Sequence, residues 1–312
     1  MNREMAKKIG IVLVLLLAII IGASFYMLDY ALSPDGNRRD VDSCYNQLFE
    51  RYPDTQSWVD SLNRIGALRD TFVVMPTGER HHALYIHTGS PKTALIIHGW
   101  RNSAVTFLFL ARLYERVLGG YNVVLPDLHA HGLSEGDMIQ MGLLDSKDVR
   151  HWLTVFQTDT MVVHGVSMGG ATTMMLAAEQ MPKGIEDLRF VDDCGYTSAW
   201  DVFEGELKNQ FGLPPFPLMY AASLLCKICY GWSFSEASAI DAVRQSPYPM
   251  LFIHGGADTF VPTEMVHRLY QAKSSDKKLW IAPGAIHARS YLAHPDEYTH
   301  QLSDFLKAKR HP

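Results

Sequence analysis

Residues 159–179 read DTMVVHGVSMGGATTMMLAAE, and this stretch decides the fold of the chain. Its first part is a β-branched apolar run typical of a buried parallel strand, and its last part is rich in Ala, Met and Leu, which favour a helix. Between them lies GVSMG at residues 165–169, a G-x-S-x-G sequence. A serine on so sharp a strand-to-helix turn is held in a strained conformation with its hydroxyl exposed. Ser167 is therefore predicted to be a nucleophile, because an incidental serine in a glycine-rich turn leaves the flanking strand and helix unexplained.

Strands and helices alternate around this stretch from residue 71 onward. Apolar segments predict strands at residues 71–75, 83–87, 93–97, 122–125, 161–163, 188–191, 250–254 and 278–281. Helices are predicted at about 104–118, 144–156, 262–273 and 295–308, and from residue 171. Repeated strand–helix units predict an α/β fold, with a mostly parallel central sheet and helices on both faces. In such a sheet, functional side chains gather at the carboxyl ends of the strands.

Residues 197–247 interrupt this alternation. The interval is too long for a plain connection, and it combines many aromatic residues with three prolines between residues 214 and 217. A poorly ordered loop would not explain so many aromatic side chains. We therefore predict a small helical cap inserted over the strand ends.

A serine hydroxyl is a weak nucleophile, so it needs a base, and the base needs an acid that orients it. On this type of sheet the chain order is serine, acid, histidine. Asp258 and His287 each come directly after a predicted strand, on neighbouring strand ends and in that order. We predict a catalytic triad of Ser167, Asp258 and His287. Asp193, which also follows a strand, is the rival acid.

The anion that forms when Ser167 attacks a carbonyl needs two preorganised N–H donors. Met168 supplies the first, because its amide opens the helix that follows the serine. The second is expected from the loop after the strand at 93–97, where His98, Gly99 and Trp100 lie. We predict the Trp100 amide as that donor and a structural role for His98.

Two further groups of potential ligands carry no predicted chemistry. His129 and His131 form an H-x-H pair, but no third or fourth ligand follows at a sensible spacing for zinc. CKIC at residues 226–229 lies in an apolar, helical segment without a second pair, so packing is the preferred interpretation over redox or metal chemistry. The predicted mechanism needs no cofactor and no metal.

Residues 9–28, IGIVLVLLLAIIIGASFYML, carry no charge and are long enough to cross a bilayer as a helix. Arg3, Lys7 and Lys8 precede this segment, which predicts a cytoplasmic N-terminus at residues 1–8 and an extracytoplasmic catalytic domain. A cleaved signal peptide is the alternative, but no strong small-x-small cleavage site is present. We expect a single-pass anchor in the inner membrane.

The remaining segments complete the predicted domain organisation. Residues 29–70 are polar, with two helices predicted around 40–51 and 55–66, and are expected to form a stalk or an arm packed on the hydrolase domain at 71–312. The chain has 312 residues, 47% of them hydrophobic, which is enough for a large core. A net charge of −5 gives no basis for binding nucleic acid.

Five motifs follow one another along the chain: HGWRNS, PDLHAHGLSEG, HGVSMGGATT, FIHGGADTFVP and GAIHARS. Over about residues 70–310 they resemble the α/β-hydrolase superfamily. They are most similar to its serine aminopeptidase and acylaminoacyl-peptidase-like branch, whose bacterial members often carry an N-terminal membrane segment. The resemblance implies the α/β-hydrolase fold and assigns the same functional residues: Ser167, Asp258 and His287 as triad, Trp100 and Met168 as amide donors.

The sequence thus predicts a serine hydrolase that cleaves carboxylic esters through an acyl-enzyme intermediate. The run at 211–232, whose one charge is Lys227, predicts a hydrophobic pocket in the cap, which favours small esters over short peptides. Two alternatives stay open. One is a serine aminopeptidase or acylpeptide hydrolase with the same triad, and the other is a non-catalytic binding protein on the same fold.

Overall fold

The computed structural model describes residues 3–34 and 40–308. Within them an eight-stranded sheet has the order β1-β2-β4-β3-β5-β6-β7-β8, and all pairs from β4 to β8 are parallel. β2 runs antiparallel to both β1 and β4. The strands are β1 (Leu68–Val74), β2 (Arg80–Ile86), β3 (Lys92–Ile97), β4 (Asn122–Pro126), β5 (Thr160–Val166), β6 (Asp187–Asp193), β7 (Met250–Gly255) and β8 (Lys277–Ala282). The predicted fold class is confirmed.

Apolar side chains of the strands contribute to a hydrophobic core on each face of this sheet. In β5, Met161 and Val163 join one cluster and Val162 joins the other, because successive side chains of a strand point to opposite faces. The first cluster lies beneath α5 (Asp145–Val155), α6 (Met168–Leu176), α9 (Ala239–Gln245) and α10 (Glu264–Ala272). The second lies beneath α2 (Val41–Arg51), α3 (Asp54–Arg64), α4 (Leu108–Arg112) and α12 (Pro295–Lys307). A short helix, α11 (Ser290–Ala293), precedes α12.

The single helix predicted at 104–118 differs from the structure. A 3-10 turn (Ala104–Phe107), α4 and a π-helical turn (Leu113–Val117) follow one another there. The carbonyl of Tyr114 accepts the N–H of Tyr121 at 3.3 Å, and the Leu118 N–H reaches back to Leu113 at 3.0 Å instead. The Tyr114 carbonyl thus bonds to a residue beyond the end of the helix, a bond that the helical pattern does not contain, and the last turn is wider than in an α-helix.

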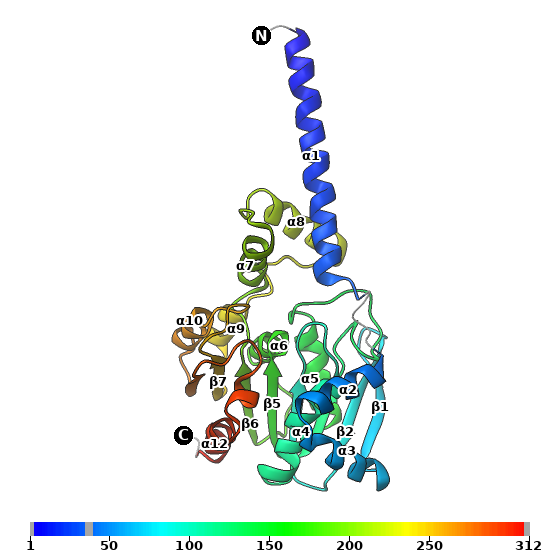
Figure 1. Cartoon of the computed structure of the whole chain (residues 1–312), viewed down its shortest axis with the longest axis vertical. Coiled ribbons are helices and arrows are strands. Elements are labelled where there is room, and N and C mark those ends of the chain that lie inside the picture. Colours follow the sequence, from blue (N-terminus) through cyan, green and yellow to red (C-terminus); the bar gives the residue numbers. More distant parts are fainter. Residues whose placement is uncertain (1–2, 35–39, 309–312) are drawn as a thin grey trace.

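The N-terminal segment forms one long helix, α1 (Arg3–Leu32), which projects from the body of the molecule (Figure 1). Of the described residues, it is the one helix long and apolar enough to cross a membrane. α1 continues beyond residue 28, the predicted end of the membrane segment. Residues 1–2 of the predicted cytoplasmic segment, 35–39 of the predicted arm and 309–312 of the predicted domain lie outside the described residues. The described part of the arm, α2 and α3, packs on the body and contributes Leu48 and Trp58 to the core.

Two helices between β6 and β7 stand apart from the sheet. α7 (Ala199–Phe211) begins at Ser198, whose hydroxyl accepts the Asp201 N–H, and α8 (Leu218–Tyr230) ends at Gly231 in the left-handed conformation. Figure 1 shows α7 and α8 beside the lower part of α1. α9 completes the interval 197–247 and packs on the body against α6. The interval predicted as a cap therefore consists of two outlying helices and one that belongs to the body.

Candidate active site

Ser167 occupies the turn between β5 and α6. Its backbone has φ 59° and ψ −118°, a conformation that costs a non-glycine residue about 1–3 kcal/mol. The Ser167 N–H donates to the Asp193 carbonyl at 2.8 Å, and the Ser167 carbonyl accepts the Ala171 N–H at 3.0 Å. These bonds hold the strained turn, so the serine sits on an elbow as the sequence pattern predicts.

Two glycines make the elbow possible because neighbouring backbone atoms lie too close to them for any side chain. A Cβ atom on Gly165 would lie 1.9 Å from the Gly169 carbonyl oxygen, and one on Gly169 would lie 2.1 Å from the Ile97 oxygen. Any side chain at either position would force α6 away from β3 and β5. The G-x-S-x-G spacing is therefore a packing requirement of this junction.

Ser167, His287 and Asp258 come together in the structure. His287 follows β8, and its Nε2 lies 2.9 Å from the Ser167 hydroxyl oxygen, while its Nδ1 lies 2.7 Å from Asp258 Oδ2. Asp258 follows β7, and its Oδ1 accepts the backbone N–H groups of Phe260 and Val261, each at 3.0 Å. These bonds orient the buried carboxylate toward the imidazole, which can then accept a proton from the serine.

Asp193, the rival acid, is held in a different arrangement. Its carboxylate accepts a hydrogen bond from the Tyr298 hydroxyl at 2.9 Å. Burial raises the pKa of Asp193 to about 7, with the Tyr298 hydrogen bond acting in the opposite direction. Since the Nδ1 atom of His287 faces Asp258, the geometry favours Asp258 as the acid.

The two predicted amide donors lie beside the serine. Met168 is the first residue of α6, where a backbone N–H has no partner within the helix. A Cβ atom on Gly99 would lie 3.3 Å from Ser167 Cβ, so the loop after β3 passes directly over the nucleophile. Trp100 lines the same cavity as Ser167 and Met168.

The histidines around this loop have structural contacts. His98 donates from Nδ1 to the Gly99 carbonyl at 2.8 Å and accepts the Leu128 N–H at 2.9 Å. His131 accepts the Arg101 N–H at 3.2 Å, and burial lowers its pKa to about 3. Both rings therefore act as neutral links between the loop after β3 and the loop after β4.

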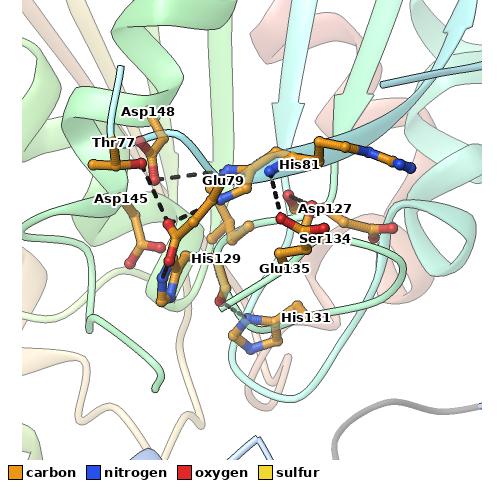
Figure 2. A network of polar contacts seen from close by, with 12 residues as sticks. Thr77, Glu79, His81, Asp127, His129, His131, Ser134, Glu135, Asp145 and Asp148 are labelled. Atoms are coloured by element: carbon orange, nitrogen blue, oxygen red, sulfur yellow. Dashed lines mark hydrogen bonds and ion pairs between the residues drawn. The ribbon is translucent and has the colours of Figure 1, made fainter. Parts of the chain in front are cut away.

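Figure 2 shows the polar network that includes His131, His129 and His81. His129 lies 3.2 Å from Glu79, and His81 lies 3.8 Å from both Glu79 and Asp148. Potential metal ligands are His, Cys, Asp and Glu side chains. Among the described residues, the one group of them close enough together to hold a metal ion is Cys194, Asp258 and His287. Burial raises the pKa of the Cys194 thiol well above its usual range, which opposes the thiolate that a metal needs. The predicted metal-free chemistry stays a prediction.

A cavity of about 100 Å³ opens next to Ser167. Apolar side chains of several helices and loops line it, among them Met27 and Ala31 of α1, Leu207 of α7, Met219 of α8, Phe234 and Phe260. Phe260 also packs on the His287 ring with 4.9 Å between ring centres. The α1 residues were not foreseen from the sequence, because a uniformly apolar membrane segment does not mark which of its side chains face the body.

A second, more polar cavity of about 340 Å³ borders His287 on its other side. Asn102, Arg51 and Arg289 line it together with aromatic side chains. None of these was predicted as a site residue, although Asn102 lies in HGWRNS and Arg289 in GAIHARS, two of the motifs that follow the strands.

The chain belongs to the alpha/beta hydrolase family, whose model matches residues 94–301. YqkD of Bacillus subtilis (strain 168) is 25% identical over 261 residues, which cover 81% of this chain and 84% of that protein. YfhR of Escherichia coli (strain K12) is 27% identical over 254 residues, which cover 78% of each. The family is thereby shown, whereas the peptidase-like branch stays a prediction.

Solved structures agree on the fold. The Pyrococcus furiosus esterase Pf2001 superposes with a TM-score of 0.60 at 23% identity, over 77% of this chain and 91% of that one. The esterase EaEST from Exiguobacterium antarcticum superposes with a TM-score of 0.55 at 15% identity, over 76% of this chain and 99% of the other. At such low identity these likenesses show a common fold and not a common substrate.

Proposed function

We propose that the protein is a serine hydrolase that cleaves carboxylic esters by an acyl-enzyme route. The observation that carries the proposal is the continuous hydrogen-bond chain from Ser167 through His287 to Asp258. His287 takes the hydroxyl proton as Ser167 attacks the ester carbonyl, and the Met168 and Trp100 amides stabilise the oxyanion. His287 then gives the proton to the leaving alcohol and activates the water that releases the acid.

The cavity beside Ser167 supports an ester substrate. Its lining is almost entirely apolar, so it suits the hydrocarbon part of an acyl group. Burial of each further methylene contributes about 0.8 kcal/mol, so kcat/KM should rise with acyl length until the cavity is full. Structural neighbours that are esterases agree with this chemistry.

One observation favours the aminopeptidase alternative. Glu206 lines the otherwise apolar cavity, and a carboxylate there could hold the ammonium group of a peptide N-terminus. Gln210 donates to this carboxylate at 2.5 Å, so part of its hydrogen-bonding capacity is already used. The ester proposal therefore needs a direct comparison of substrates.

We expect p-nitrophenyl esters of short to medium chains to be much better substrates than aminoacyl-p-nitroanilides. A series of both, measured by release of p-nitrophenol or p-nitroaniline, tests this ranking. Glu206→Gln should leave ester hydrolysis within about twofold, since the side chain lies outside the reacting centre. A higher kcat/KM for an aminoacyl anilide than for any ester, abolished by Glu206→Gln, would establish the peptidase instead. Failure of a fluorophosphonate to label Ser167 would favour the binding protein.

We also propose that α1 is an uncleaved anchor with its N-terminus in the cytoplasm. Its outer two thirds present apolar side chains to the surroundings, and Lys7 and Lys8 lie near its start. The protein is expected to fractionate with membranes and to keep its N-terminus, as N-terminal sequencing can show. A soluble mature form beginning near Ser24 would establish a signal peptide, and protection from external protease in spheroplasts would reverse the orientation.

A further inference from the structure

The carboxyl end of α1 is built into the cavity beside Ser167. Met27, Tyr30 and Ala31 line that cavity together with Trp100. The Trp100 indole N–H donates to the Ala31 carbonyl at 2.9 Å, which satisfies one of the free carbonyls at the helix end. The proposed membrane helix is therefore fixed on the loop of the proposed oxyanion donor and forms a wall of the acyl site.

α8 lies against α1 at a height that falls within the predicted membrane segment. Ser24 of α1 is fully buried, and its hydroxyl lies 3.5 Å from the carbonyl of Leu218, the first residue of α8. Ser24 precedes residue 28, the predicted end of the membrane segment, by four residues, which is about 6 Å along a helix. Interfacial helices bury their apolar face about 5–10 Å deep, so α8 has the depth of such a helix.

The surface that α8 presents at this depth is apolar. Residues spaced by four form a stripe whose members are between 57% and 71% exposed: Phe216, Tyr220, Leu224 and Ile228. The one charged residue of α8, Lys227, is paired with Glu236 at 2.8 Å. A contiguous exposed stripe of this kind is unfavourable in water and marks an interaction surface. Since α8 packs against α1, whose outer part also exposes apolar side chains, the occupant that fits is the same bilayer.

The polar cavity beside the proposed base offers a place for the leaving group. His287 must give its proton to the leaving oxygen, and this cavity borders His287.

Arg51 and Arg289 both line this polar cavity, and no carboxylate of the described residues pairs with either. Burial first, and the neighbouring Arg51 second, lower the pKa of Arg289. Asp193 also lines the cavity, but its carboxylate accepts the Tyr298 hydroxyl. Two guanidinium groups without a counter-ion suit an anionic headgroup.

We propose that the substrate is a membrane lipid with one acyl ester and an anionic headgroup, which enters from the bilayer on the side of the cavity that α1 and α8 line. This inference rests on the proposed ester hydrolysis and on the proposed anchor. The acyl chain occupies the apolar cavity, and the headgroup faces Arg51 and Arg289. Attack by Ser167 forms the acyl-enzyme and releases the headgroup alcohol with the proton from His287, and water then releases the fatty acid. A lysophospholipid has this chemistry.

The test uses the full-length protein in vesicles of a diether phosphatidylcholine, which contains no ester that the enzyme could cleave. Lysophosphatidylglycerol at a few per cent serves as the substrate, and released fatty acid is measured. Leu224→Asp combined with Ile228→Asp should lower the rate on this lipid by at least about tenfold, because charges weaken the seating of α8 in the interface. Hydrolysis of soluble p-nitrophenyl butyrate should stay unchanged, since neither side chain lines the cavity.

Two controls separate this inference from the function on which it rests. Ile65→Asp changes an apolar residue of similar exposure on the body, 74% exposed, and should leave both activities unchanged. If wild-type protein cleaves neither p-nitrophenyl butyrate nor the lysolipid, the proposed hydrolase function fails. If it cleaves p-nitrophenyl butyrate but not the lysolipid, or if the α8 double variant keeps full activity on vesicles, lipid entry from the bilayer is overturned.

The cavity wall and the headgroup side have separate tests. Ala31→Phe should lower the rate on the long-chain lysolipid by a larger factor than the rate on p-nitrophenyl acetate, whereas Tyr26→Ala on the exposed side of α1 should change neither. Arg51→Gln with Arg289→Gln should remove a preference of about tenfold for lysophosphatidylglycerol over the neutral monoacylglycerol, while the exposed Arg64→Gln should keep it. Equal rates of wild type on both lipids would overturn the anionic headgroup.

Discussion

Ser167→Ala is expected to lower kcat on a p-nitrophenyl ester by about 10⁵-fold, and His287→Ala by a similar factor. The Ser167 hydroxyl and the His287 imidazole lie 2.9 Å apart. Ser167→Ala removes the nucleophile, and His287→Ala removes the base that accepts its proton. The double variant should lose little more than either single variant, because the two groups act as a unit. Steady-state kinetics on purified protein measure all three losses.

The backbone at the elbow makes a matched control necessary. Alanine at position 167 keeps the same strained φ of 59°, so the variant should fold, and its melting temperature should stay near that of wild type. Ser61→Ala removes a hydroxyl that bonds to the Trp58 carbonyl at 2.7 Å on α3, far along the chain from the elbow, and should retain full activity. Retention of more than about a tenth of wild-type kcat by Ser167→Ala would mean that another residue is the nucleophile.

The sequence predicted the positions around the elbow because short-range rules act there. Ser167, Asp258 and His287 each follow an apolar strand, and parallel strands place their carboxyl ends at one edge of a sheet. The order of these residues along the chain therefore predicted which side chains could meet. The structure adds the distances, and the contact of Asp193 with Tyr298 could not be read from the sequence, since it joins β6 to a helix over a hundred residues away.

Contacts outside the regular helix and strand repeats explain what the sequence did not predict. At the π-helical turn after α4, the Tyr121 N–H bonds to the Tyr114 carbonyl, and no helical periodicity encodes this bond. The contact of α1 with α8 joins positions 194 residues apart, at Ser24 and Leu218. In an uncharged segment, every side chain is equally compatible with the hydrocarbon of a bilayer. The sequence pattern therefore does not show that one side of the helix faces the protein. The wall of the acyl cavity was missed for that reason.

Asp258→Asn is expected to lower kcat by about 10⁴-fold and Asp193→Asn by no more than severalfold. The Asp258 carboxylate accepts the Nδ1–H of His287 at 2.7 Å, and it would stabilise the imidazolium that forms as Ser167 attacks. An amide cannot stabilise that charge, and its NH₂ group favours the wrong tautomer of the ring.

At Asp193, an amide oxygen can still accept the Tyr298 hydroxyl, and burial already raises the pKa of this carboxyl to about 7. Asparagine therefore replaces a group that is protonated to a substantial degree near neutral pH, with nearly the same shape and little change of charge. The Ser167 N–H also keeps its acceptor, because that bond goes to the backbone carbonyl of residue 193. Measuring kcat for both variants at pH 7, with melting temperatures as the check on folding, decides between the two carboxylates. An inactive Asp193→Asn beside an active Asp258→Asn would transfer the role of the acid to Asp193.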